Sequence, residues 1–96
     1  MDLYIILRNG FTDVAALEAA AKRSAAEGDK PGSGVRWIRS YVTPQEGSKV
    51  GTVCVYEADS PEAIRAHAEA AGLPADEIVP IADTVVVRPD PAPIAG

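Results

Sequence analysis

The sequence predicts an α+β domain in which two helices cover one face of a four-stranded antiparallel sheet. Strand-type and helix-type stretches follow one another in the order strand, helix, strand, strand, helix, strand. With 96 residues and 47% hydrophobic content, the chain can build one small core but not two. We therefore expect one domain at 1–88 in the split βαβ arrangement, followed by a tail at 89–96.

The first strand is expected at 3–7, where isoleucine and leucine dominate before Asn9 and Gly10 form a turn. A helix follows, with Thr12 as its N-cap and Asp13 near the positive end of its dipole. Gly28 ends this helix. Its narrow apolar stripe consists of Val14, Leu17, Ala21 and Ser24 or Ala25.

The second and third strands are expected at 35–43 and 50–57, joined as a hairpin through 44–48. Side chains in a strand alternate between the two sheet faces. This alternation puts Trp37, Arg39 and Tyr41 on one face and Ile38 and Val42 on the other.

The second helix has clear signals at both ends. Ser60 is the expected cap, Pro61 suits the first helical position, and Gly72 ends the helix. A last strand is expected at 78–88, with Pro80 near its start. The proline-rich tail at 89–96 should be extended and poorly ordered. The inward stripe of the second helix is Ile64, His67, Ala68 and Ala71.

The helices leave the second sheet face open, and the alternation predicts which side chains gather there. We expect Leu3, Ile5 and Leu7 in the core, together with Ile38 and Val42. The open face would then carry rings, guanidinium groups and a thiol, which suit a dimer contact, a cavity between subunits, or an anion held by Arg8 and Arg39. The candidate ligand-pocket or dimer-face residues are Tyr4, Arg8, Trp37, Arg39, Tyr41 and Tyr56, with Ile6, Thr52 and Cys54 on the same side.

Charge and composition exclude several classes of protein. A net charge of −5 argues against nucleic-acid binding, which needs clustered Lys and Arg. No apolar run is long enough to cross a bilayer, and the first residues do not resemble a signal peptide, so we expect a cytoplasmic protein. A single cysteine rules out an intramolecular disulfide and agrees with a reducing compartment.

The residues suited to metal binding are few. Cys54 and His67 are the only cysteine and histidine, so one subunit does not supply a site built wholly from nitrogen and sulfur ligands. Cys54 is equally explained as a small apolar residue, and His67 as a hydrogen-bonded structural histidine. Acidic residues near helix N-termini are explained by the dipole, although carboxylates at a subunit junction would complete a metal site. The acidic residues in question are Glu57, Asp59, Glu62 and Glu69.

Three separated segments, 37–43, 54–56 and 64–75, resemble a family of small bacterial ferredoxin-like proteins of unknown function that includes a nickel-binding protein. The resemblance spans about 3–87 and implies a homodimer of the dimeric α+β barrel type. The family commonly has histidine where this chain has Arg39, and a guanidinium cannot donate a lone pair to a metal. His67 and Cys54 match the family's pattern, which makes them the metal-ligand candidates and nickel the candidate cofactor.

Three functions are consistent with these patterns. The leading hypothesis is a homodimeric binding protein, similar to the nickel-binding family, that takes a divalent metal or a small anionic ligand; whether the chain is an enzyme is left open, and binding without catalysis is favoured. The alternative is a small-molecule isomerase, cyclase or cofactor-free monooxygenase with its pocket on the open sheet face. In that enzyme, Arg39 and Arg8 would orient an anionic substrate while Tyr41, Tyr56 or His67 moves protons. The third is an interaction module without a ligand.

Overall fold

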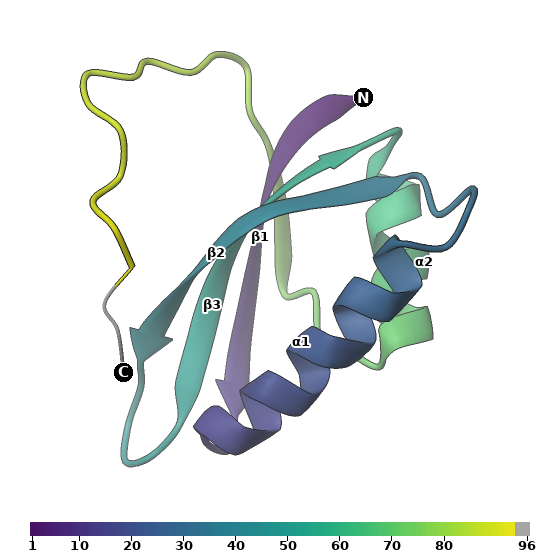
Figure 1. Cartoon of the computed structure of the whole chain (residues 1–96). Helices are drawn as coiled ribbons and strands as arrows, with labels where there is room; N and C mark the ends of the chain where they lie inside the picture. Colours follow the sequence, from purple (N-terminus) through teal and green to yellow (C-terminus); the bar gives the residue numbers. More distant parts are fainter. Residues whose placement is uncertain (94–96) are drawn as a thin grey trace.

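The computed structural model describes residues 1–93 and confirms the predicted βαββαβ order (Figure 1). The strands are all antiparallel neighbours in the order β2-β3-β1-β4, which is the ferredoxin-like arrangement. No helix among residues 1–93 is long and apolar enough to cross a membrane. The elements are β1 Asp2–Phe11, α1 Val14–Gly28, β2 Val35–Pro44, β3 Val50–Ala58, α2 Pro61–Ala71 and β4 Glu77–Pro80.

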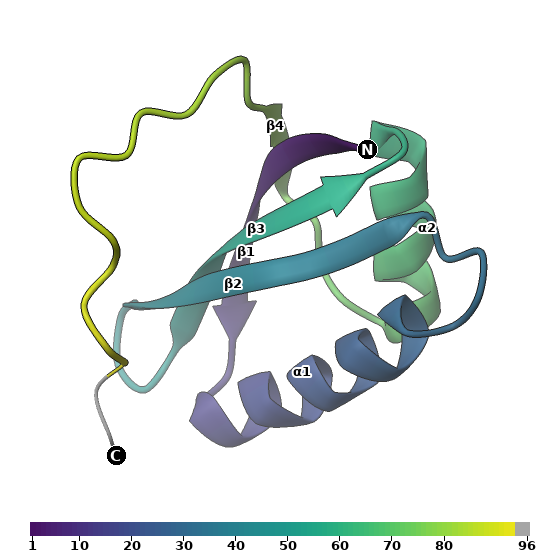
Figure 2. The same cartoon turned by 45° about the horizontal axis from the view of Figure 1, so that its top comes forward.

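Both helices lie on one side of the sheet, and the segment after β4 runs along the other side (Figures 1 and 2). The two helices are joined near their ends, where Arg23 of α1 donates a hydrogen bond of 2.8 Å to the carbonyl oxygen of Ala71 in α2. This contact links α1 to the end of α2, and α1 forms the roof of the site described below.

Capping explains where the helices begin and end. The cap of α2 is Ser60, as predicted, and Gly72 ends the helix with φ of 69°, a backbone conformation that glycine adopts without strain. The predicted cap of α1 was wrong by one residue. Asp13, not Thr12, caps α1, because the Asp13 Oδ1 accepts a hydrogen bond of 2.8 Å from the Ala16 amide.

The core lies between the sheet and the helices. Ile64 of α2 is fully buried against side chains of β1 and β3, and the predicted inward stripe of α2 is confirmed. A smaller cluster joins Phe11, Ala20 and Val50 near the other end of α1. The main cluster consists of Tyr4, Ile6, Val35, Cys54, Tyr56, Ala58 and Ile64.

The predicted assignment of the two faces was wrong for β1 and β3. Tyr4, Ile6 and Arg8 point toward the helices and are at most 5% exposed, whereas Leu3, Ile5 and Leu7 lie on the open face. Their β3 partners on the helix side, Thr52, Cys54 and Tyr56, are buried in the same way. The physical reason is volume, because two alanine-rich helices leave a gap that only the larger side chains of the strands can fill.

A β-bulge in β2 breaks the predicted alternation of Trp37, Arg39 and Tyr41. Trp37 pairs with Tyr56, but Arg39 pairs with Val55, so Ile38 is an extra residue in β2. Trp37 therefore lies on the helix side, while Arg39 and Tyr41 lie on the open face. Ile38, expected in the core, is 38% exposed.

The last strand is shorter than predicted. β4 ends at Pro80 instead of continuing to 88, and only the Ile81 amide adds one further bond, of 3.0 Å, to the Leu3 carbonyl oxygen. Residues 82–93 have no helix or strand. The part of the predicted disordered tail at 94–96 lies outside the described residues. Within the described part, Asp90 contacts both Tyr41 and Arg39.

The position of the α1 cap can be tested by a pair of substitutions. Asp13→Ala should lower the free energy of unfolding by about 1 kcal/mol, because an N-terminal amide of α1 loses its acceptor. Thr12→Ala, one residue earlier, should change it by less than about 0.5 kcal/mol. Urea denaturation of both variants measures the difference, and an equal or larger loss for Thr12→Ala would contradict this cap.

Candidate functional site

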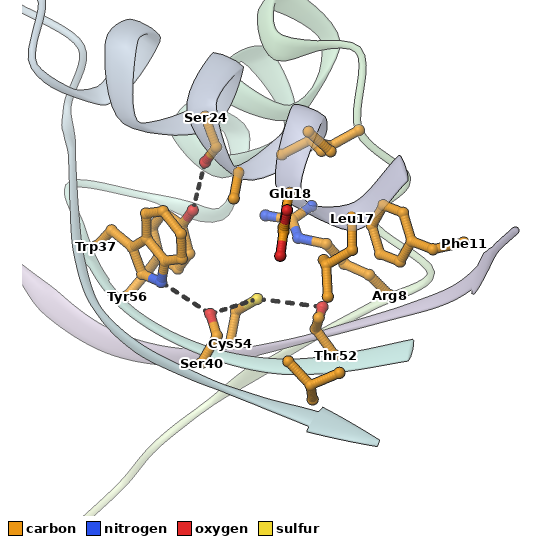
Figure 3. A pocket seen from close by; sticks show the side chains of 14 residues that line it. Arg8, Phe11, Leu17, Glu18, Ser24, Trp37, Ser40, Thr52, Cys54 and Tyr56 are labelled. Carbon is orange, nitrogen blue, oxygen red and sulfur yellow. Dashed lines mark hydrogen bonds between the residues drawn. The ribbon is translucent and has the colours of Figure 1, made fainter. Parts of the chain in front are cut away.

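A cavity of about 300 Å³ lies between α1 and the sheet, and we call it the α1 cavity (Figure 3). Its roof comes from α1 and its floor from β1, β2 and β3, so it exists because the alanine side chains of α1 stop short of the sheet. Its lining residues are Arg8, Phe11, Leu17, Glu18, Ala20, Ala21, Ser24, Trp37, Ser40, Val42, Thr52, Cys54, Tyr56 and Leu73.

Arg8 is the only cationic side chain that lines the α1 cavity, and it is 2% exposed. Its Nη1 donates a hydrogen bond to the carbonyl oxygen of Pro74, and its guanidinium carbon lies 5.8 Å from the centroid of the Tyr56 ring. Among residues 1–93, Arg8 Nη2 has no hydrogen-bond partner and no carboxylate forms a salt bridge with this guanidinium. Arg8 is therefore a buried charge with one unused donor group.

Three buried side chains form a hydrogen-bonded row beside the cavity. Ser24 Oγ of α1 lies 2.8 Å from the Tyr56 phenol oxygen and 3.0 Å from His67 Nε2 of α2. Burial raises the pKa of Tyr56, an effect that its Ser24 bond and the Arg8 charge oppose, so the phenol stays neutral at ordinary pH. The row links both helices to the sheet through one serine.

Only one of the two ring nitrogens of His67, Nε2, forms a hydrogen bond within residues 1–93. Its Nδ1 is buried and has no partner within residues 1–93. Burial lowers the pKa of His67 below its ordinary value of 6.5, and the Arg8 charge lowers it further, against an opposing effect of Glu27. His67 also lines a second pocket, of about 270 Å³, which Glu27 and Lys30 share.

A chain of hydrogen bonds runs along the floor of the α1 cavity from Trp37 to Thr52 (Figure 3). Trp37 Nε1 donates to Ser40 Oγ at 2.8 Å, and Ser40 donates to Cys54 Sγ at 3.0 Å. The thiol in turn donates to Thr52 Oγ1 at 3.3 Å. These groups satisfy one another, so the floor offers few free donors to a ligand.

The two predicted metal ligands do not contact each other through any hydrogen bond. Cys54 bonds to Ser40 and Thr52, whereas His67 bonds to Ser24. In the part of the chain that the structure describes, no three His, Cys, Asp or Glu side chains gather as a metal site would require. The two metal-ligand candidates predicted from the sequence are thus both buried, but they belong to separate hydrogen-bond networks.

The six predicted pocket or dimer-face residues fall on two sides of the sheet. Tyr4, Arg8, Trp37 and Tyr56 lie on the helix side, and all but Tyr4 line the α1 cavity. Arg39 and Tyr41 lie on the open face, where Arg39 Nε is 3.6 Å from an Asp90 carboxylate oxygen. The Asp90 hydrogen bond raises the pKa of Tyr41. The α1 cavity therefore gathers three of the six predicted residues, whereas Arg39 and Tyr41 lie on the opposite face of the sheet.

Sequence reasoning did not identify Ser24 and Glu18 as parts of a site. Ser24 is 3% exposed, and it is the polar member of an otherwise alanine-rich inner surface of α1. A lone serine at an inward position of an alanine helix is the signal that would have identified a buried hydrogen-bond partner. Glu18 carried no comparable signal, because exposed glutamates are ordinary in helices.

Comparisons with known proteins agree with this fold. A family model described as "Nickel responsive protein SCO4226-like" matches residues 4–81. The crystal structure of SCO4226 from Streptomyces coelicolor A3(2) is similar, with a TM-score of 0.67 and 22% sequence identity over 86% of this chain and 99% of that chain. No curated protein matches the chain. At this identity the structural likeness concerns the fold alone.

The lowered pKa of His67 predicts a pH dependence of stability. The unfolded chain binds a proton to His67 near pH 6.5, whereas the folded chain resists it, so stability is full above that pH and falls as the pH drops toward the folded pKa. Urea denaturation at about pH 7.5 and about pH 5.5 should show a smaller loss for His67→Gln than for the parent. Equal losses in the two proteins would mean that His67 titrates alike folded and unfolded.

Proposed function

Because the chain belongs to the SCO4226-like family of nickel-responsive proteins, we propose that it is a small homodimeric, cytoplasmic binding protein whose metal ligand is His67. The observation that carries the proposal is the buried Nδ1 of His67, which has no partner within residues 1–93 and belongs to a side chain that lines a pocket shared with Glu27. Imidazole nitrogen suits nickel, and an added carboxylate is compatible with it.

The donor set fits an open nickel site and not a closed one. His67 and Glu27 are the only His, Cys, Asp or Glu residues among those that line this second pocket, so water or another chain has to supply the remaining ligands. Glu27 Oε1 now accepts from Lys30 Nζ at 2.9 Å, and a bound cation would displace that ammonium. Cys54 does not belong to this set, because its thiol lies in the α1 cavity.

The proposed dimer contact is the open sheet face. Ile5 is at its centre, paired with Val55 on one side and Val79 on the other. An apolar sheet face is the kind of surface that a small domain buries against a second copy. The apolar residues of this face are Leu3, Ile5, Leu7, Val53, Val55 and Val79.

The segment after β4 supports a second copy on this face. Residues 82–93 extend away from the domain and return toward β2, forming an arch on the open side (Figure 2). Val85, Val86 and Val87 in this arch are 85%, 71% and 78% exposed. Three adjacent exposed valines would be covered if the arch closed over a partner chain.

The dimer proposal predicts the effect of a charge at the centre of the open face. Ile5→Glu should convert the dimer to a monomer, because a carboxylate at the contact would lose its hydration. Ala26→Glu places the same charge on the exposed side of α1 and should leave the dimer unchanged. Sedimentation or light scattering measures the mass, and a parent protein that is already monomeric would contradict the proposal.

The nickel proposal predicts which substitutions weaken binding. His67→Gln should reduce nickel affinity by about tenfold or more, and Glu27→Gln should reduce it less, because imidazole is the stronger ligand. Cys54→Ser is the control and should leave the affinity unchanged. Titration calorimetry with nickel and zinc measures all three. Unchanged binding by His67→Gln, or no heat above dilution with the parent, would remove His67 as the ligand.

A further inference from the structure

We propose that the α1 cavity binds a small aromatic carboxylate, with the Arg8 guanidinium as the counter-charge. This site is separate from the nickel ligand and the dimer face, because it lies between α1 and the sheet and includes neither His67 nor an open-face residue.

Arg8 is the group that requires a ligand. A buried charge is unfavourable unless it is paired, and the Pro74 carbonyl oxygen and the Tyr56 ring offset only part of that cost. Arg8 is only 2% exposed, and its Nη2 has no hydrogen-bond acceptor within residues 1–93. A guanidinium has parallel N–H groups that match a carboxylate, so an organic carboxylate is the natural missing partner.

Glu18 is the one carboxylate among the residues that line the cavity. Glu18 and Arg8 line the same cavity (Figure 3), yet their side chains form no salt bridge in the described structure. Glu18 is an exposed residue, so water can solvate its charge, and the buried guanidinium stays without a carboxylate partner within residues 1–93. A ligand that enters therefore gains the pairing that Glu18 does not make.

The other walls of the cavity favour a ligand with a flat, apolar ring. Trp37 and Tyr56 are nearly parallel, with 6° between their planes and 6.1 Å between centroids, and Phe11 and Leu17 add apolar surface. The Tyr56 hydroxyl is already bonded to Ser24, and the floor groups bond to one another. A cavity of about 300 Å³ is at the small end of ligand sites, which suits a single aromatic ring with one acidic group.

The cavity has a route to solvent. Trp37 and Val42 line it from β2, an edge strand, and are 37% and 55% exposed. A ligand can therefore enter between α1 and β2 without unfolding the core, and its ring would follow the Trp37 side chain inward to Arg8.

Benzoate and benzamide, added to the full chain without metal, test the proposal because they share a shape and differ in charge. Benzoate should bind saturably, with a preference over benzamide of about tenfold or more. NMR titration should place the shifts at Trp37 and Ser24 and not at Ile5. Equal affinity for the two compounds, or no binding of benzoate at millimolar concentration, would overturn the proposal.

Arg8→Met and Arg39→Met are matched variants that separate the two arginines. Arg8→Met should reduce benzoate affinity by about tenfold or more and remove the preference over benzamide, while Arg39→Met, on the open face, should change neither. The ligand-free Arg8→Met protein should be no less stable than the parent, since it loses an unpaired buried charge. Unchanged benzoate binding by Arg8→Met would overturn the assignment, and the comparison of the two compounds on the parent stands even if this variant fails to fold.

Discussion

Two alanine-rich helices lie on this sheet, and the space that their short side chains leave decides the positions of the other side chains. Tyr4, Tyr56 and Arg8 turn toward the helices because the layer needs their volume. Even so the layer is not filled under α1, where Ala20 and Ala21 face the floor. The α1 cavity is what remains, so the same shortage of side-chain volume produces both the inward tyrosines and the site.

Placing Arg8 in this layer has an energetic consequence. An apolar side chain of similar length would fill the same space without the cost of burying a charge. A residue kept at such a cost is typical of a functional position, where stability is given up for binding. The hydrogen-bonded row of Tyr56, Ser24 and His67 differs, because it pairs the Tyr56 hydroxyl, Ser24 Oγ and His67 Nε2 with one another and links both helices to the sheet.

The two faces of the sheet carry different kinds of side chain. The helix side carries the cavity, the histidine and the thiol, while the open face carries aliphatic side chains and the Asp90 contacts of the tail. Substitutions can therefore test the proposed binding on one side and the proposed association on the other independently.

Sequence patterns were enough to predict the order of elements, both ends of α2 and its inward stripe, because capping and helical periodicity act within a few residues. Sequence patterns did not show which face of β1 packs against the helices. One face carries Tyr4 and Ile6 and the other carries Leu3, Ile5 and Leu7, so both are apolar and alternation does not distinguish them. Only packing against the short side chains of the helices made that choice. The bulge at Ile38 depends on the pairing between β2 and β3, so it too is a product of tertiary structure. It put Trp37 among the residues that line the α1 cavity and Arg39 on the opposite side of the sheet.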